Sequence, residues 1–200
     1  MRRSMATMLA TLGALSTPLA AQSGVDSGAV ASTRVRGGAY SLGLAATIGQ
    51  SWQFEAAEIG YVRRRPHGAI GGLSVSARLG SFIDQGVILG GSRGFLFGAT
   101  VAARSATAKV AEIGDEQNLT LLGLDVTLEA SGYLAAKSPL PQGSQWAAVS
   151  LLPALRIGSG DGPRYAVMVG PTVFIGKETE WRGLLALRVE TPLARGGAHP

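Results

Sequence analysis

Apolar residues alternate with small or polar residues at every second position through much of the chain between Ala39 and Glu190. Between Leu73 and Leu79, leucine, valine and alanine occupy the odd-numbered positions, and serine and arginine occupy the even-numbered ones. A period of two places the apolar side chains on one face of an extended strand and the polar side chains on the other. The pattern therefore predicts β-strands with two unlike faces.

Eight such runs are separated by short connections rich in glycine, proline, aspartate and serine, which favour turns. Short connections favour antiparallel neighbours, because a parallel crossover needs a dozen or more residues. We expect an all-β fold, an eight-stranded antiparallel up-and-down β-barrel of the outer-membrane type. Pro153 lies inside the sixth run and predicts a bulge or an irregular ladder there. The expected strands are 39–48, 52–63, 69–82, 95–110, 119–134, 146–157, 165–175 and 181–189.

The first residues have the features of a secretory signal peptide. Arg2 and Arg3 precede an uncharged segment that ends at Leu19, and the small residues Ala20 and Ala21 supply a cleavage site. Its apolar part is too short to span a bilayer comfortably. We expect a cleaved signal peptide at 1–21, an N-terminal segment at 22–36, one barrel domain at 37–193 and a C-terminal tail at 194–200.

The composition excludes several functional classes. The chain has no cysteine, which excludes disulfides, thiolate metal sites and a lipoprotein anchor. Removing the leader takes two of the 18 Lys and Arg residues and none of the 13 Asp and Glu residues, so the remaining charge is nearly balanced. We therefore expect no nucleic acid among the partners.

Candidate chemistry is sparse. The only histidines are His67, in an expected turn, and His199, in the tail, which leaves a serine triad without a base and a zinc site without ligands. Asp125 and Glu129 share one face of a strand, where they are weak evidence for paired-carboxylate chemistry. We expect no catalysis, no metal and no cofactor; a lipid-modifying enzyme would have to use His67.

Charged residues on the polar strand faces point into the lumen if the apolar faces point outward. An eight-stranded barrel is only wide enough for side chains to fill it, so these charges should pair with one another, since unpaired burial is costly. A lumen that conducts ions or binds a ligand is the alternative. The expected network comprises Glu55 (or Glu58), Arg78, Arg104, Asp125, Glu129, Arg156, Arg188 and Glu190.

Eight of the twelve aromatic residues fall near the ends of expected strands. A membrane barrel concentrates aromatic side chains in two interfacial belts. The alternative is that they cap the core of a small soluble barrel, since Trp and Tyr favour half-wet positions. The expected belt comprises Trp52, Tyr61, Phe82, Phe95, Tyr133, Trp146, Tyr165 and Trp181.

Together, the leader, the eight alternating runs and the aromatic residues at their ends resemble small bacterial outer-membrane β-barrels of the outer membrane protein A and X type, over about residues 37–193. This likeness of pattern implies an eight-stranded barrel inserted from the periplasm with a structural, adhesive or membrane-stabilising role. Two features depart from the family: the last strand is followed by 191–200 without a terminal aromatic residue, and the connections are short.

The leading hypothesis is thus an outer-membrane barrel with a structural or narrow-pore role, in contact with outer-membrane lipid and, during biogenesis, with the assembly machinery. The alternative is a soluble exported barrel of lipocalin-like design that binds a lipophilic ligand, since exchanging inside and outside leaves the alternation unchanged. A soluble barrel should carry many lysines on its outer face. The mature chain has only Lys109, Lys137 and Lys177, all at strand ends or in connections, which favours the membrane.

Overall fold

A computed structural model of the chain describes residues 37–48, 52–64, 68–84, 94–114, 120–136, 142–159 and 162–193. The expected signal peptide, the segment at 22–36 and the tail at 194–200 lie outside these residues. None of the described residues forms a helix long and apolar enough to cross a membrane. The strands are β1 (Gly38–Ile48), β2 (Trp52–Arg64), β3 (Ile70–Asp84), β4 (Gly94–Ser105), β5 (Ala108–Ile113), β6 (Thr120–Ala135), β7 (Gln145–Gly158), β8 (Arg164–Ile175) and β9 (Thr179–Pro192).

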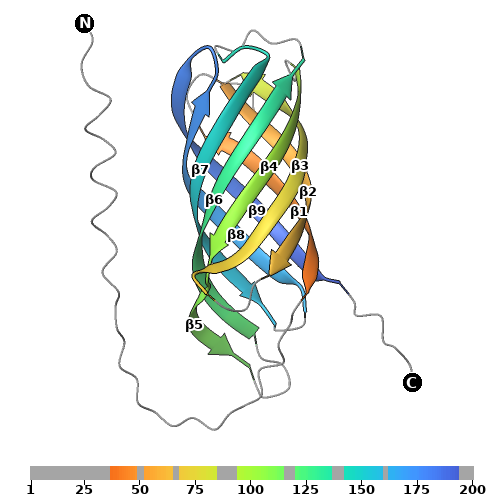
Figure 1. Cartoon of the computed structure of the whole chain (residues 1–200), viewed down its shortest axis with the longest axis vertical. Helices are drawn as coiled ribbons and strands as arrows, with labels where there is room; N and C mark the ends of the chain where they lie inside the picture. The colour runs from red at the N-terminus through yellow and green to blue at the C-terminus, as the bar shows by residue number, and fades with distance from the viewer. Residues whose placement is uncertain are drawn as a thin grey trace, which may run out of the picture. The chain divides into compact units, whose positions relative to one another are not determined.

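Eight of these strands form a closed antiparallel barrel (Figure 1). Each pairs with its neighbour in the order β4-β3-β2-β1-β9-β8-β7-β6, and β4 pairs with β6 to close the sheet. The pairing of β1 with β9 joins the two ends of the chain's strand series. Closure leaves no open sheet edge around the barrel wall. The predicted eight-stranded antiparallel barrel is therefore confirmed.

The run expected as one strand at 95–110 is two strands, which corrects the fourth expected element. β4 ends at Ser105, and β5 begins at Ala108. β3 begins to pair with β4 at Ile70, which stands opposite Ser105, the last residue of β4. β3 therefore does not extend alongside β5. β5 therefore pairs only with β6, across a register irregularity between Lys109 and Ala111, and lies outside the barrel as a ninth strand.

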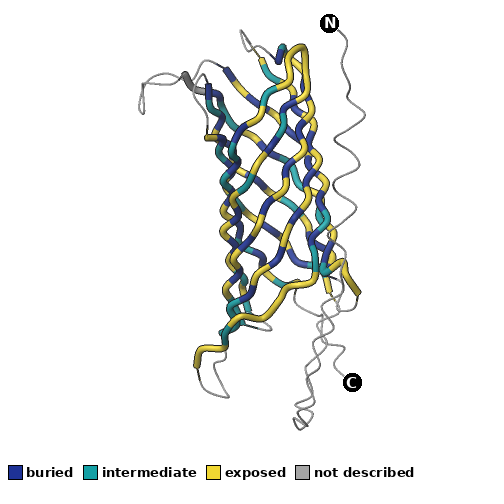
Figure 2. Tube along the Cα trace, turned by 90° about the vertical axis from the view of Figure 1, so that its left-hand side faces the viewer, coloured by how far each residue is buried: buried dark blue, intermediate teal, exposed yellow. Residues whose placement is uncertain are grey.

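Burial alternates along the barrel strands as the sequence period requires (Figure 2). In β7, each even-numbered residue from Trp146 to Arg156 is buried, and the odd-numbered residues between them are exposed. The exposed rows carry mostly apolar side chains, such as Leu151 and Leu155, whereas the buried rows carry nearly all of the buried charged residues together with small, polar and aromatic ones. The apolar faces of the strands therefore point outward.

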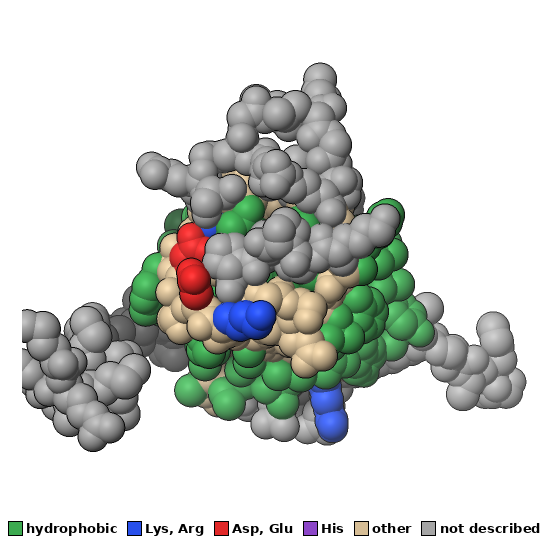
Figure 3. Space-filling view, turned by 90° about the horizontal axis from the view of Figure 1, so that it is seen from above, with side chains coloured by type: hydrophobic (Ala, Val, Ile, Leu, Met, Phe, Trp, Pro, Cys, Tyr) green, Lys and Arg blue, Asp and Glu red, His purple; other side chains and the backbone are tan. Residues whose placement is uncertain are grey.

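We call the end at which β1 begins at Gly38 and β9 ends at Pro192 the lower end, as in Figure 1. The opposite end, where β1 leads into β2, is the upper end. Seen from the upper end, hydrophobic side chains surround the barrel on its outside (Figure 3).

The predicted irregularity at Pro153 takes the form of an interrupted ladder rather than a bulge. The β7–β8 register pairs Ser150 with Thr172 and resumes at Ala154 with Met168. The register does not shift across the gap, so no residue is inserted. Proline has no N–H to donate to the ladder, which explains the missing pairs.

Replacement by alanine should have different effects on stability at Gly80 and at Gly132. A Cβ at Gly80 would collide with the backbone carbonyl oxygen of Glu55 on β2, whereas a Cβ at Gly132 would meet no atom within 4 Å. We expect Gly80→Ala to lower the free energy of unfolding in urea by about 1–3 kcal/mol through overpacking. Gly132→Ala should leave it unchanged or raise it slightly, because glycine weakens a strand. Equal losses in the two variants would contradict the tight β2–β3 approach.

Candidate functional site

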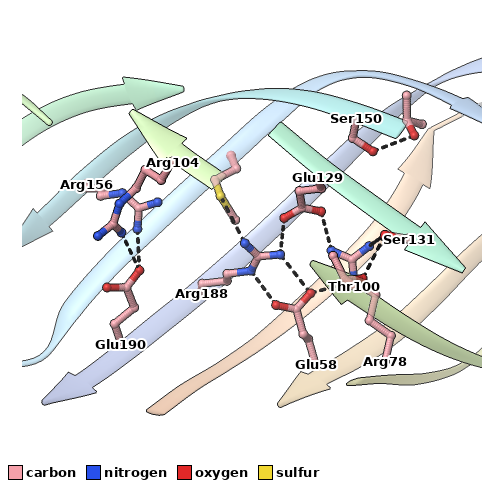
Figure 4. Close-up of polar contacts among 12 residues, drawn as sticks. Glu58, Arg78, Thr100, Arg104, Glu129, Ser131, Ser150, Arg156, Arg188 and Glu190 are labelled. Atoms are coloured by element: carbon pink, nitrogen blue, oxygen red, sulfur yellow. Dashed lines mark hydrogen bonds and ion pairs between the residues drawn. The ribbon is translucent and has the colours of Figure 1, made fainter. Parts of the chain in front are cut away.

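Four charged side chains form a ring across the middle of the lumen, which we call the central quartet: Glu58, Arg78, Glu129 and Arg188. Arg78 donates from Nε to Glu58 and from Nη2 to Glu129, each at 2.7 Å. Arg188 completes the ring, with Nε 2.6 Å from Glu58 and Nη2 donating to Glu129 (Figure 4). Two cations alternate with two anions, so the quartet is neutral.

The strand register places the members of the quartet together. Glu58 on β2 stands directly opposite Arg78 on β3, while Glu129 and Arg188 come from β6 and β9. Arg78 is completely buried and also donates from Nη1 to the Tyr133 hydroxyl at 2.6 Å. Buried ion pairs tolerate their desolvation only when remaining donors and acceptors are also satisfied. The tyrosine supplies one such partner for Arg78.

A second group of charges lies at the lower end, and we call it the lower cluster: Arg64, Arg104, Asp125, Arg156, Arg164 and Glu190. Glu190 accepts hydrogen bonds from Arg104 and Arg156 at 2.8 Å each, and from Arg64 at 3.4 Å. Asp125 accepts from Arg156 Nε and, at 3.1 Å, from the Thr107 hydroxyl. These groups come from six different strands or connections around the lumen.

The lower cluster has more cations than anions. It contains four arginines and two carboxylates, and one of those carboxylates, Glu190, is shared by three of the arginines. Arg64 Nε and Nη1 and Arg104 Nε are buried without a hydrogen-bond partner among the described residues, as is one acceptor, Asp125 Oδ1. The lower cluster is thus the part of the lumen where the charge of the described side chains is not balanced.

The upper part of the lumen is filled by aromatic rings, which we call the aromatic plug: Trp52, Phe54, Tyr133, Trp146 and Phe174. Ring centroids of contacting pairs lie 5.4–6.4 Å apart, mostly in tilted or edge-to-face arrangements. Such geometries suit the quadrupoles of the rings.

Three polar side chains at the upper end contact the plug or one another, and we call them the polar cap: Gln142, Glu180 and Arg182. Arg182 lies 4.4 Å from the Trp52 ring centroid and pairs with Glu180 at 2.5 Å. Glu180 also accepts from Gln142 at 2.8 Å and from the Trp52 indole at 3.3 Å. The single carboxylate of Glu180 thus connects three side chains of the cap and the plug.

The structure places the expected lumen charges as follows. Glu55 is exposed on the outer face, which corrects its assignment, and Glu58 takes the inward position. Residues of β2 alternate from the buried Trp52, so an odd-numbered residue must point outward. The other seven residues are buried in the lumen: Arg78, Arg104, Asp125, Glu129, Arg156, Arg188 and Glu190.

The expected aromatic belt divides into two groups. Tyr61, Phe95, Tyr165 and Trp181 point outward, but the other four expected members do not. Those four lie on the buried rows of their strands, and proximity to a strand end does not reveal which face a residue occupies. The inward members, which correct the belt, are Trp52, Phe82, Tyr133 and Trp146.

Three lumen arginines escaped the sequence reasoning: Arg64, Arg164 and Arg182. Arg64 stands between two other arginines at the end of β2, and it shares the even-numbered face of Glu58. Arg182 likewise shares the face of Arg188. Extending the two-residue period to the strand ends was the signal that could have found both.

No group of three or more His, Cys, Asp or Glu residues within the described ranges could hold a metal ion. His67 and His199 lie outside those ranges, so the lipid-modifying alternative that depends on His67 is not tested. Comparison of the chain with protein-family models, with curated proteins and with solved structures finds no match. The site must therefore be interpreted from its own geometry.

The central quartet predicts a strong contrast between two identical substitutions. Glu129→Gln leaves Arg78 and Arg188 with one shared carboxylate, and we expect it to lower the free energy of unfolding by about 3–5 kcal/mol. Glu55→Gln, on the outer face, should change it by less than about 0.5 kcal/mol. Urea titration monitored by tryptophan fluorescence measures both. A small effect of Glu129→Gln would show that the quartet does not hold the strands together.

Proposed function

We propose that this chain is an outer-membrane β-barrel with a structural, membrane-stabilising role and a closed lumen. The observation that carries the proposal is the chemistry of the outer face, where each of the eight barrel strands exposes large hydrophobic side chains. Soluble monomers rarely expose contiguous apolar patches of more than a few hundred Å². Lipid contact explains why the apolar side of each strand points away from the interior.

The outward aromatic residues support the same interpretation. Tyr40, Tyr61 and Tyr165 point outward near the lower end, where Tyr40 stands opposite Tyr61 in the β1–β2 register. Phe95 and Trp181 point outward near the upper end. Aromatic girdles at two interfaces are typical of membrane barrels.

Strand length also agrees with the proposal. A tilted β-strand needs about 9–11 residues to cross a bilayer. The eight barrel strands contain from 11 residues in β1 to 16 residues in β6. Export by the expected signal peptide, contact with outer-membrane lipid and insertion by the assembly machinery are parts of this proposal.

The interior favours a closed barrel over a pore or a ligand-binding cup. The aromatic plug occupies the upper lumen and the central quartet crosses the middle. A cavity between the quartet and the lower cluster, bordered by Glu58, Arg104 and Glu190, has a volume of only about 10 Å³. One water molecule needs about 10–15 Å³. A lipophilic ligand of the kind a lipocalin binds would have to displace buried ion pairs.

Location is tested by fractionation. The expressed full-length chain should be recovered with the outer membrane, and its gel mobility should change on boiling because the folded barrel resists detergent. Recovery in the soluble periplasm without a heat-dependent shift would overturn the proposal in favour of the soluble alternative.

Arginine substitutions on the outer face test lipid contact directly. Leu128 is exposed at the middle of β6, and Ile113 is exposed on β5, outside the barrel. In phospholipid vesicles, Leu128→Arg should destabilise the folded barrel by about 2–4 kcal/mol, and Ile113→Arg by no more than about 0–1 kcal/mol. Denaturant titration of the two vesicle-inserted variants measures the difference. Equal, small effects would contradict a membrane-facing surface at Leu128.

The closed lumen predicts an absence of conduction. In planar lipid bilayers, the wild-type protein should produce no stepwise current, because the plug and the quartet obstruct the path in series. Protein-free detergent added to the same bilayer is the control. Reproducible single-channel steps from the folded protein would support the narrow-pore role instead.

A further inference from the structure

We propose that the lower end of the barrel carries a binding site for a phosphate group. The site is the cavity of about 130 Å³ between the β5–β6 hairpin and the start of β8. This volume far exceeds the roughly 10–15 Å³ needed for one water molecule. The inference concerns the lower end alone and does not depend on whether the outer face of the barrel meets lipid.

The lining of this cavity is one-sided in charge. Three of its nine lining residues are cationic, Lys109, Arg156 and Arg164, and none is acidic. The Thr107 hydroxyl also lines the cavity, where it donates to Asp125 at 3.1 Å. Guanidinium groups match the geometry of phosphate oxygens through paired N–H donors, and an ammonium adds a point charge. The lining therefore has the composition of an oxyanion site.

The neighbouring lower cluster strengthens the attraction for an anion. Its four arginines face two carboxylates, so a bound dianion would balance the charge of the described side chains. Arg64 and Arg104 also retain buried N–H groups without partners. Their side chains are only 7% and 8% exposed, so bulk water satisfies little of this donor capacity. Arg156 joins the cavity to the cluster, because it lines the cavity and also donates to Asp125 and Glu190.

Acidic groups near the cavity limit the attraction without cancelling it. Glu112 forms an ion pair with Lys109, but both side chains are exposed, at 38% and 59%. Exposed pairs of this kind contribute little, so Lys109 can exchange its partner for an anion. Asp125 and Glu190 are already engaged by Arg156 and its neighbours. Arg64 and Arg104 in the adjoining lower cluster, with their unpartnered N–H groups, supply positive charge that these carboxylates do not balance.

This assignment also gives β5 a role. The β5–β6 hairpin continues beyond the last pairing of β4, where it adds nothing to barrel closure. It does supply Lys109, along with Leu121, Leu122 and Gly123 of β6, as one wall of the cavity. The ligand chemistry is a phosphate group with at least two free oxygens. Free inorganic phosphate and the phosphate of a lipid headgroup both provide it.

The test uses the folded full-length protein in a neutral maltoside detergent. Sodium phosphate should raise the melting temperature in a saturable manner, whereas sodium chloride at equal ionic strength should not. Calorimetric titration with sodium phosphate gives the affinity directly. Arg164→Gln should weaken phosphate binding at least tenfold.

Matched variants separate binding from folding. Arg63→Gln removes an arginine that points outward at the same end of the barrel and should leave the phosphate affinity unchanged. Lys109→Gln changes an exposed side chain and should weaken binding several-fold without affecting the fold. If Arg164→Gln fails to fold, the phosphate affinities of Lys109→Gln and Arg164→Lys test the proposal instead. Arg164→Lys should retain part of the wild-type phosphate affinity.

A second arm distinguishes the two sources of phosphate. Vesicles of phosphatidylcholine with or without phosphatidic acid are compared, and soluble phosphate is used as a competitor. Stabilisation by phosphatidic acid that depends on Arg164 assigns the site to a headgroup, and competition by soluble phosphate alone assigns it to the free ion. Identical responses to phosphate and chloride, or equal losses in Arg164→Gln and Arg63→Gln, would overturn the proposal.

Discussion

Charge pairing across the lumen is the interaction on which this architecture depends. An eight-stranded sheet encloses a space that side chains just fill, so charged residues on inward rows can find counterions on other strands. Arg78 on β3 and Arg188 on β9 each contact the carboxylates of Glu58 and Glu129. The neighbouring strands β2 and β3 are thereby connected with β6 and β9, which lie much further along the sequence, at one level of the lumen. Removing one partner of such a pair costs more than the pair contributes to net stability, because the other charge is then buried without a counterion.

The lumen is organised in three levels that differ in charge. Aromatic rings under the Arg182–Glu180 cap close the upper end, and a neutral quartet fills the middle. The lower cluster holds an excess of arginine beside an open cavity. This gradient separates two roles: the first two levels stabilise a closed barrel, while the third is the place where the described residues have unused capacity to bind an anion. The proposed structural role and the proposed phosphate site therefore occupy different parts of one interior.

The outer face depends on the same alternation in the opposite sense. Aromatic residues show how strictly the two faces are separated, since Tyr61 and Trp181 point outward while Trp52 and Tyr133 lie within the plug. All four lie near strand ends, and each takes its role from the face of its own strand on which it lies. Parity likewise decides that Glu55 points outward and Glu58 inward, although they are three residues apart on one strand. A shift of the strand register by one residue would exchange these roles.

The alternation and the short connections were enough to predict the number of barrel strands, their antiparallel order and most inward charges, because a period of two is a local property of extended chain. Local pattern could not show where the fourth expected strand leaves the barrel wall, so it missed that β5 is a separate strand outside the barrel. It also could not show that Glu190 gathers three arginines, or that Arg164 and Lys109 share a cavity. Those relationships arise only when closure brings residues from distant strands to the same level of the lumen.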